Sequence, residues 1–218
     1  MTCDLNKTND NKNISFVNKT KCVGVVIDDK LCWKDHVSYI SSKVARGVGM
    51  FIKARQYLNR NALVTLYYSF IYPYLTYCNH LWGATYPSTH KGLVRLQNTV
   101  VRIICGARRF VSTDYLFNKL GLLKFSSINV YLISKFMYRK YNNEIPNLCI
   151  EFNINRDIHE YNTRQSTYYH VPRIKSNLGK FNIRFRGTLI WNRILSLGID
   201  PCTSEAVFMK AIKNGCTQ

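Results

Sequence analysis

The sequence predicts a mainly α-helical protein, in which a helical bundle is preceded by a short β-strand or hairpin and followed by a smaller α+β C-terminal region. Apolar residues recur every three or four positions in several segments between residues 35 and 141, as on the buried face of a helix. The strand-like run before them, residues 21–27, is short and rich in valine. Beyond residue 142 alternating polar and apolar residues replace this spacing, so strands are expected there beside helices.

The first two elements are a strand and a long amphipathic helix. Residues 21–27 (KCVGVVI) are followed by Asp28 and Asp29, which is typical of a strand that enters a turn. Asp35 is then expected to cap a helix over residues 36–58. The buried face of that helix would contain Val37, Ile40, Val44, Val48, Phe51 and Ile52.

An uncharged stretch, residues 61–90, is the most apolar part of the chain and is expected at the centre of the helical core. Pro73 divides its helical pattern, which predicts a kinked helix or two short helices. A transmembrane span of about 20 residues is the alternative interpretation. Asn79, His80, several tyrosines and the central proline argue against that span, so no membrane partner is expected.

Serine, glycine and proline residues mark where the later helices and strands are expected to begin and end. Helices are expected from Ser88 or Thr89 to about Gly106, from Ser112 to Gly121, from Ser126 or Ser127 to Tyr141, over residues 187–197 and over residues 204–213, with a strand over residues 181–185. The chain is accordingly divided into a flexible segment (1–20), a strand with a helical domain (21–141), a linker (142–160) and an α+β tail (161–218).

Charge is distributed unevenly along the chain. The sequence has 31 Lys and Arg against 12 Asp and Glu, a net charge of +19, and between residues 35 and 144 fifteen bases stand against one acid, Asp114. A surface with one sign of charge repels itself unless a polyanion covers it, and nucleic acid is the polyanion that this pattern indicates. Lys91, Arg95 and Arg102 would share one helix face. A general compositional bias is the alternative, but it does not explain the shortage of acids.

No residue pattern in the sequence indicates an enzyme site. The eight cysteines are spread singly without a C-x-x-C pair and the five histidines are scattered, so we expect no metal site and reduced thiols packed mostly as small hydrophobic groups. Asp28 and Asp29 are paired carboxylates, for which capping of a turn is favoured over catalysis. The N-terminal residues lack the apolar block of a secretory signal, so the chain is expected inside the cell.

Five motifs in order resemble the region just after the polymerase core in reverse transcriptases of non-LTR (LINE-type, jockey-like) retrotransposons. They are VGVVIDDKLCWKDHV (from Val23), LYYSFIYPYLTYC (from Leu66) with Trp82 and Gly83, LQNTVVRII (from Leu96), YNTR (from Tyr161) and FRGTLIWN (from Phe185), followed by Phe208 and Lys210. Their order and spacing match the family over nearly all of the chain from Lys21. One departure is Cys22-Val23-Gly24, where the family usually has an aromatic residue, Leu and Gly; the change still suits a buried strand.

The resemblance implies a primer-grip hairpin followed by a thumb-like helical bundle. Val23, Gly24, Val25 and Trp33 would lie in the primer-grip region, which holds the 3′ end of the growing strand. A thumb clamps the duplex of RNA template and DNA primer through the duplex backbone, because the polymerase must move along every sequence that it copies. The residues expected to position this duplex are Lys43, Arg46, Lys53, Arg95, Arg102, Arg108 and Arg109.

The resemblance also implies that the chemical step lies elsewhere. Polymerases of this family hold two magnesium ions on aspartates that would precede residue 21, and no aromatic-Ala-Asp-Asp turn occurs in this sequence. We therefore expect no cofactor in this chain and no polymerase activity from it alone, with the rest of the parent polymerase as a partner and the nucleus as its location. The alternative is a non-catalytic structural or interaction module, or a decayed transposon remnant without activity.

Overall fold

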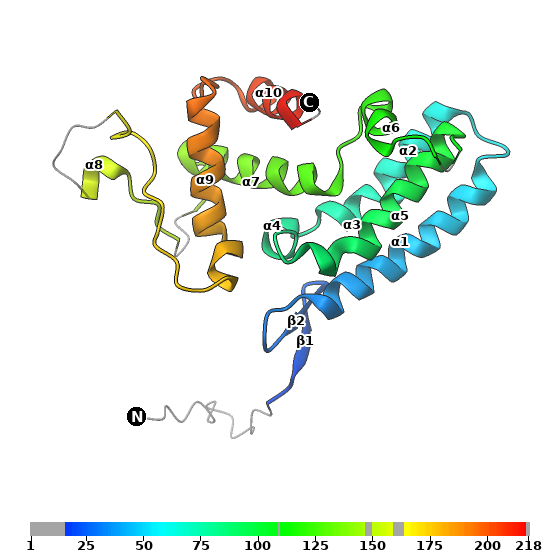
Figure 1. Cartoon of the computed structure of the whole chain (residues 1–218), viewed down its shortest axis with the longest axis horizontal. Coiled ribbons are helices and arrows are strands. Elements are labelled where there is room, and N and C mark those ends of the chain that lie inside the picture. The colour runs from blue at the N-terminus through cyan, green and yellow to red at the C-terminus, as the bar shows by residue number, and fades with distance from the viewer. Residues whose placement is uncertain (1–15, 109, 147–149, 159–163, 217–218) are drawn as a thin grey trace.

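The computed structural model describes residues 16–108, 110–146, 150–158 and 164–216 of the chain (Figure 1). Within these residues the chain is mainly helical, with a two-stranded antiparallel sheet near the N-terminus, which confirms the expected class. The strands are β1 (Lys19–Cys22) and β2 (Val25–Asp28). The helices are α1 (Lys34–Ala54), α2 (Arg60–Phe70), α3 (Tyr72–Thr76), α4 (Asn79–Trp82), α5 (Pro87–Cys105), α6 (Thr113–Leu120), α7 (Phe125–Tyr141), α8 (Asn155–Ile158), the 3-10 helix η1 (Leu178–Phe181), α9 (Ile183–Ser196) and α10 (Glu205–Cys216).

The single strand predicted over residues 21–27 is wrong, because the chain reverses in the middle of it. Cys22 pairs with Val25, so Val23 and Gly24 form a two-residue turn. Both have positive φ, 46° and 81°, as a turn that matches the twist of a β-hairpin requires. The Val-Gly dipeptide is therefore a turn and not part of a buried strand, and Val23 is 80% exposed.

Contacts from two later segments fix the hairpin against the helices. Tyr77 Oη donates a hydrogen bond to the Val23 carbonyl at 2.6 Å, which attaches the turn to the end of α3. The Val26 N–H donates to His36 Nδ1 at 3.2 Å, and the His36 side chain is buried in the first turn of α1. The hairpin therefore has a defined position beside the start of α1 (Figure 1).

Asp28, and not Asp35, satisfies the backbone before α1. Its carboxylate accepts the N–H groups of Cys32 and Trp33 at 2.9 and 3.0 Å. Trp33 adopts a left-handed conformation (φ 62°) immediately before the first helical residue. Asp35 lies in the first turn and pairs with Lys19 at 3.7 Å, so the prediction that it caps the helix is wrong. An acid in the first turn still suits the positive end of the helix dipole.

The first hydrophobic core lies among α1 to α6 and the start of α7. Its centre comes from the uncharged stretch, whose fully buried side chains include Tyr67, Ile71, Leu75 and Trp82. The part of this stretch before α5 forms the three helices α2, α3 and α4, whereas the sequence predicts one kinked helix or two short helices. Pro73 lies in the first turn of α3, and Cys78 adopts a left-handed conformation (φ 49°) that separates α3 from α4.

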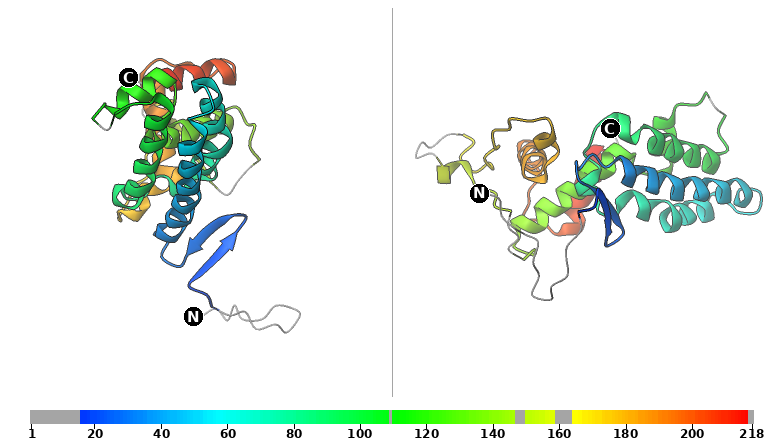
Figure 2. Two further views of the ribbon diagram at one scale, coloured as in Figure 1. Left: turned by 90° about the vertical axis from the view of Figure 1, so that its right-hand side faces the viewer. Right: turned by 90° about the horizontal axis from the view of Figure 1, so that it is seen from below.

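α7 belongs to two cores. Phe125 and Ile128 in its first half pack in the first core, whereas Ile133, Met137 and Tyr138 pack with α9 and α10 in a second core. At about 100° per residue the two sets lie on different sides of the helix. Figure 2 shows α7 between the α1–α6 bundle and α9. The predicted division of the chain into segments stays a prediction.

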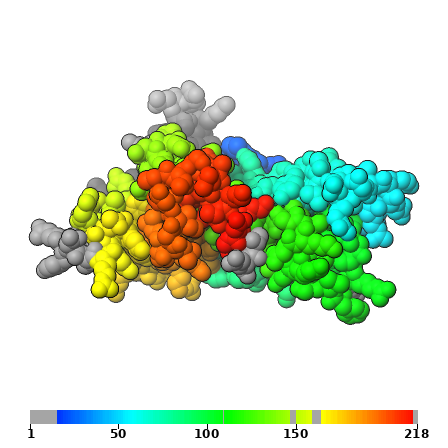
Figure 3. Space-filling view, turned by 90° about the horizontal axis from the view of Figure 1, so that it is seen from above, coloured from blue at the N-terminus to red at the C-terminus, as the bar shows by residue number. Residues whose placement is uncertain are grey.

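The strand predicted over residues 181–185 is wrong. η1 is followed directly by α9, because the Asn182 side chain accepts the Arg184 N–H at 2.8 Å and so caps a helix. Among the described C-terminal residues, the β pairing is one isolated bridge between Ile154 and Tyr169. α9 and α10 confirm the two helices expected there, and they cover the middle of the molecule in the space-filling view (Figure 3).

Candidate nucleic-acid interface

The ion pairs of the described chain use bases outside the candidate interface. They are Lys19–Asp35 (3.7 Å), Lys124–Asp114 (2.9 Å), Lys135–Glu205 (2.9 Å), Arg139–Glu205 (3.3 Å) and Arg139–Glu144 (4.0 Å). Within the described residues, the bases that are expected to position a duplex and have no carboxylate partner are Lys43, Arg46, Lys53, Arg95, Arg102 and Arg108. The charges of these six bases are therefore not balanced by a carboxylate of the described chain.

α1 carries three of the six bases, with Arg46 and Lys53 exposed opposite its buried face and Lys43 half-buried at the edge of that face. Near the hairpin, Lys43 lies 5.4 Å from the centre of the Tyr39 ring, and Lys21 of β1 lies 4.8 Å from the same centre. Lys21 also lies 3.4 Å from the Tyr39 hydroxyl, and this hydrogen bond is the main reason why the pKa of Tyr39 is lowered. One tyrosine ring thus brings together two lysines from two different elements.

Arg46 and Lys53 line one shallow hollow farther along α1, together with Gly49, Met50 and Tyr57. The two bases are seven positions apart, so they lie on nearly the same side of the helix, roughly 10 Å apart along its axis. The Tyr57 ring is 84% exposed. Basic side chains beside an exposed aromatic ring suit a nucleic-acid strand, because the basic groups can bind phosphates and the ring can stack on a nucleobase.

α5 carries a second row of bases. Lys91 and Arg95 are exposed, and Arg102 continues the row half-buried, with a buried Nε that has no hydrogen-bond partner among the described residues. Arg108 is exposed in the turn after α5, and Arg109 lies outside the described residues. α1 and α5 pack against each other through their buried faces, so the exposed bases of the two rows lie on outward sides of the bundle.

The four residues expected in the primer-grip region differ in accessibility. Val23 is exposed in the hairpin turn beside Gly24, whereas Val25 is buried and Trp33 is half-buried at the start of α1. The Trp33 ring meets the His36 ring edge-on, with 6.3 Å between ring centres, so it packs in the junction of hairpin and helix. A ligand would reach the turn at Val23 and Gly24 but not the Val25 side chain.

Asp28 has the geometry of a structural carboxylate, which confirms the capping interpretation. Its two oxygens accept the Cys32 and Trp33 N–H groups. Burial alone would raise the pKa of Asp28, but these hydrogen bonds hold it below its ordinary value. Both oxygens therefore accept a backbone N–H in the turn before α1.

The described part of the chain holds neither a metal-binding cluster nor a membrane-spanning helix. No group of three or more His, Cys, Asp or Glu side chains there is placed to hold a metal ion. No helix within it combines the length and apolar character needed to cross a bilayer. Cys22, Cys32 and Cys202 are exposed and Cys78 and Cys105 are half-buried, so the prediction of packed thiols is wrong for the first three.

Gln97, from the motif LQNTVVRII, is buried and joins three helices, a role that the sequence analysis missed. Its Nε2 donates to Tyr67 Oη of α2 at 2.9 Å and to the Leu123 carbonyl at 3.0 Å. Its Oε1 accepts the Phe125 N–H at the start of α7 at 2.9 Å. The sequence feature that could have revealed this role is an amide side chain at an inward position of an apolar helix face.

A second buried amide contact connects α4, α7 and α9. Asn129 Nδ2 donates to Asn79 Oδ1 at 2.9 Å, and Asn129 Oδ1 accepts a hydrogen bond from Arg186 Nη2 at 3.2 Å. The Asn79 amide in turn donates to the Leu75 carbonyl at 2.8 Å. Asn79 lies beside the second motif and Arg186 in the last one, so the motif residues hold the helices together from inside while the candidate bases lie outside.

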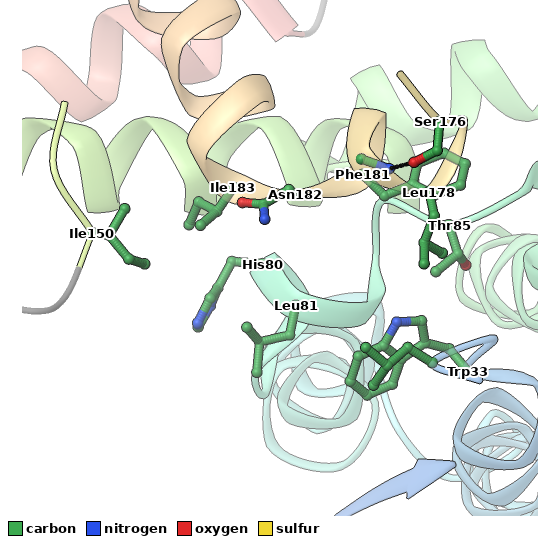
Figure 4. Close-up of a pocket in the computed structure, with 12 residues that line it drawn as sticks. Trp33, His80, Leu81, Thr85, Ile150, Ser176, Leu178, Phe181, Asn182 and Ile183 are labelled. Atoms are coloured by element: carbon green, nitrogen blue, oxygen red, sulfur yellow. Dashed lines mark hydrogen bonds between the residues drawn. The ribbon is translucent and has the colours of Figure 1, made fainter. Parts of the chain in front are cut away.

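A cavity of about 520 Å³ lies between α4 and the segment that includes η1 and the start of α9 (Figure 4). Its lining is mainly apolar and includes Trp33, Leu81, Phe181 and Ile183. His80 is the titratable side chain in it, and burial lowers the pKa of that imidazole. No lysine or arginine lines this cavity, so it does not belong to the candidate nucleic-acid interface.

The fold and the surface together define a basic, mainly helical protein whose helices are joined by buried amides. No family model matches the chain, and no solved structure matches it significantly. Over 116 residues the chain is 29% identical to the probable RNA-directed DNA polymerase from transposon X-element of Drosophila melanogaster. The match covers 51% of this chain and 13% of that protein, so the chain spans a small part of its relative's length. This distant similarity supports a reverse-transcriptase-related origin.

Proposed function

We propose that this chain is a nucleic-acid-binding part of a reverse transcriptase of the non-LTR retrotransposon type, and that it clamps the duplex of RNA template and DNA primer. The observation that carries the proposal is the set of six bases on α1, α5 and the following turn that have no acid partner among the described residues. The similarity to a transposon RNA-directed DNA polymerase supports the choice of this duplex. The order of the motifs supports its place after a polymerase core.

In this proposal the basic side chains bind phosphates and do not distinguish one nucleotide sequence from another. Lys43 and Lys21, brought together at Tyr39, would bind the duplex near the hairpin, and Arg46 and Lys53 would bind it farther along α1. Phosphates repeat along a strand whatever its bases are, so such contacts let a duplex slide past. The hairpin turn at Val23 would approach the same duplex from the start of α1.

Binding of a fluorescent RNA–DNA hybrid to the full chain, measured by anisotropy over a series of salt concentrations, tests the proposal. Arg46→Gln/Lys53→Gln removes two exposed charges of α1, and Lys175→Gln/Lys180→Gln removes two exposed charges of the C-terminal region as a matched control. Each phosphate contact contributes about 0.9 to the slope of log affinity against log salt on duplex DNA, so the α1 variant should lose roughly 1.8. Between about 50 and 200 mM salt, the advantage of the wild-type chain should shrink roughly twelvefold.

The control variant should keep the wild-type slope, because its bases lie outside the candidate rows. Hybrids of unrelated sequence should bind alike, and the chain should not extend a primer when magnesium and nucleotides are added. A folded chain that binds no hybrid at low salt, or binds it with an affinity that ignores salt, would contradict the proposal. That result would favour a structural module or an inactive transposon remnant.

A further inference from the structure

A second cavity is lined by residues of α5, α6, α7 and α9 and of the turn after α4. Its volume is about 410 Å³, and its lining includes His90 and Gln97 of α5, Asn129 of α7 and Arg186 of α9. None of the bases expected to position a duplex lines it. A cavity of this size can enclose a small organic ligand, and it is separate from the basic rows on α1 and α5.

Two buried nitrogen atoms at this cavity have no hydrogen-bond partner among the described residues. His90 is 5% exposed, and its Nε2 lies 2.8 Å from Thr85 Oγ1, but its Nδ1 is unpartnered. Arg186 Nη2 donates to Asn129 Oδ1 at 3.2 Å, but its Nε is likewise unpartnered. Buried polar atoms are normally hydrogen-bonded, and two of the four unpartnered buried side-chain atoms in the described residues belong to side chains that line this cavity.

The charges around the cavity favour an anion. Arg186 belongs to no ion pair in the described part of the chain, and the carboxylate that lines the cavity, Asp114, is already paired with Lys124 at 2.9 Å. Burial lowers the pKa of Arg186 because its charge is poorly solvated there, and burial lowers the pKa of His90 to about 4. At neutral pH His90 is thus an uncharged hydrogen-bonding group. Two bases line the cavity, Lys124 and Arg186, and since Lys124 is paired with Asp114, Arg186 is the positive charge available to an anion.

The remaining walls of the cavity are largely apolar. Phe117 and Phe125 supply two aromatic rings, and Val94 and Val130 supply aliphatic surface. A ligand that matches this lining has an anionic group at one end, for the guanidinium, and a flat body with few charges for the walls. A nucleotide has both parts.

We propose that this cavity binds one nucleotide, with its phosphate on Arg186 and its base against the apolar walls beside His90. The nucleotide is either free in solution or an unpaired unit at the end of a bound strand. The choice of a nucleotide among anions of this size rests on the proposed function, whereas the anion site itself rests on the cavity. The chain would then hold a duplex with its basic rows and a single unpaired nucleotide in this cavity.

Calorimetric titration of the full chain with AMP, adenosine and inorganic phosphate tests the site. AMP should bind at least tenfold more tightly than adenosine, which lacks the charge, and than phosphate, which lacks the base. Arg186→Gln should weaken AMP binding at least tenfold, whereas Arg184→Gln, at an exposed position of the same helix, should not. Val94→Phe fills part of the cavity and keeps Arg186, so it should also weaken AMP binding and serves as the test if Arg186→Gln does not fold.

Competition distinguishes the two sources of the nucleotide. If the cavity binds the end of a strand, a hybrid with one unpaired 3′ nucleotide should displace AMP and a blunt hybrid should not. If neither hybrid displaces AMP, the ligand is the free nucleotide. Arg46→Gln/Lys53→Gln should retain AMP binding and Arg186→Gln should retain salt-dependent hybrid binding, which separates this site from the clamp. The site would be overturned if the folded wild-type chain binds no AMP, if phosphate binds as tightly as AMP, or if both Arg186→Gln and Val94→Phe leave AMP binding intact.

Discussion

Replacement of Gln97 by methionine should destabilise the fold, because this one buried amide satisfies three polar groups. Its Nε2 donates to Tyr67 Oη and the Leu123 carbonyl, and its Oε1 accepts the Phe125 N–H, all at 2.9–3.0 Å. Methionine has a similar length and volume, so the substitution should open little new space. The loss of stability would come from the three groups that are left buried without a partner.

Each such group costs about 1–3 kcal/mol. Tyr67 is fully buried and Phe125 is 4% exposed, so bulk water is poorly placed to replace the amide. Allowing for partial relaxation, the free energy of unfolding should fall by about 3–5 kcal/mol, against about 5–15 kcal/mol for a typical domain. Tyr67→Phe should restore about 1 kcal/mol in the Gln97→Met background, because it removes an orphaned hydroxyl, although it should cost about 1 kcal/mol in the wild-type chain.

Urea unfolding followed by circular dichroism measures the free energy of unfolding for the wild type, the two single variants and the double variant. Thr99→Met, at an exposed position of α5, is a control that should stay within about 0.5 kcal/mol of the wild type. The reasoning is refuted if Gln97→Met loses less than about 1 kcal/mol. Equal effects of Tyr67→Phe in both backgrounds would contradict an energetic coupling between the two side chains through their hydrogen bond.

Two further substitutions test the packing and the hairpin. Gly83→Ala should lower the free energy of unfolding by about 1–3 kcal/mol, because the new Cβ would collide with the Asn79 amide. Gly92→Ala is the control: its Cβ meets open space on α5, so this variant should be neutral or stabilising. Equal urea midpoints for the two variants would contradict the predicted collision. Asp28→Asn should destabilise the chain at neutral pH, and the difference from wild type should shrink as pH falls below about 4. The folded pKa of Asp28 is below the unfolded value of about 3.9, so its stabilising effect is complete above that value and is lost as pH falls through the folded pKa. Urea unfolding of both chains between about pH 3 and pH 7 measures this difference in the free energy of unfolding. A difference that does not change with pH would contradict the stabilising role of the ionised Asp28 carboxylate.

Helical spacing is enough to locate the main helices, because each has one face in a core. The end predicted near Gly106 is correct to one residue, since that glycine adopts a φ of 61° and stops α5 at Cys105. The errors arise where one residue's backbone preference outweighs the composition around it. Residues 21–27 and 181–185 are both strand-like in composition, but Gly24 turns the chain in the first, and Asn182 caps a helix in the second.

Contacts between residues far apart in the chain are not visible in its sequence. Glu205 lies 66 positions beyond Arg139 and binds both that side chain and Lys135, so these two members of the basic segment share one carboxylate of the tail. The partners of Gln97 and Asn129 are similarly distant. The sequence shows that an amide occupies an inward position, but its hydrogen-bond partner depends on how the helices pack. The same limit applies to the cavity around Arg186, whose lining comes from several helices and the loops between them.

Because α7 is shared by both cores, the protein should unfold as one unit. α7 is a continuous helix of 17 residues, roughly 25 Å long, so neither core can melt without withdrawing part of it from the other. A shortened chain that ends at Tyr141 would keep this helix but would expose Ile133, Met137 and Tyr138 to water, and such an apolar strip favours self-association. For the same reason, two pieces made by protease cleavage after α7 should stay together until they are denatured.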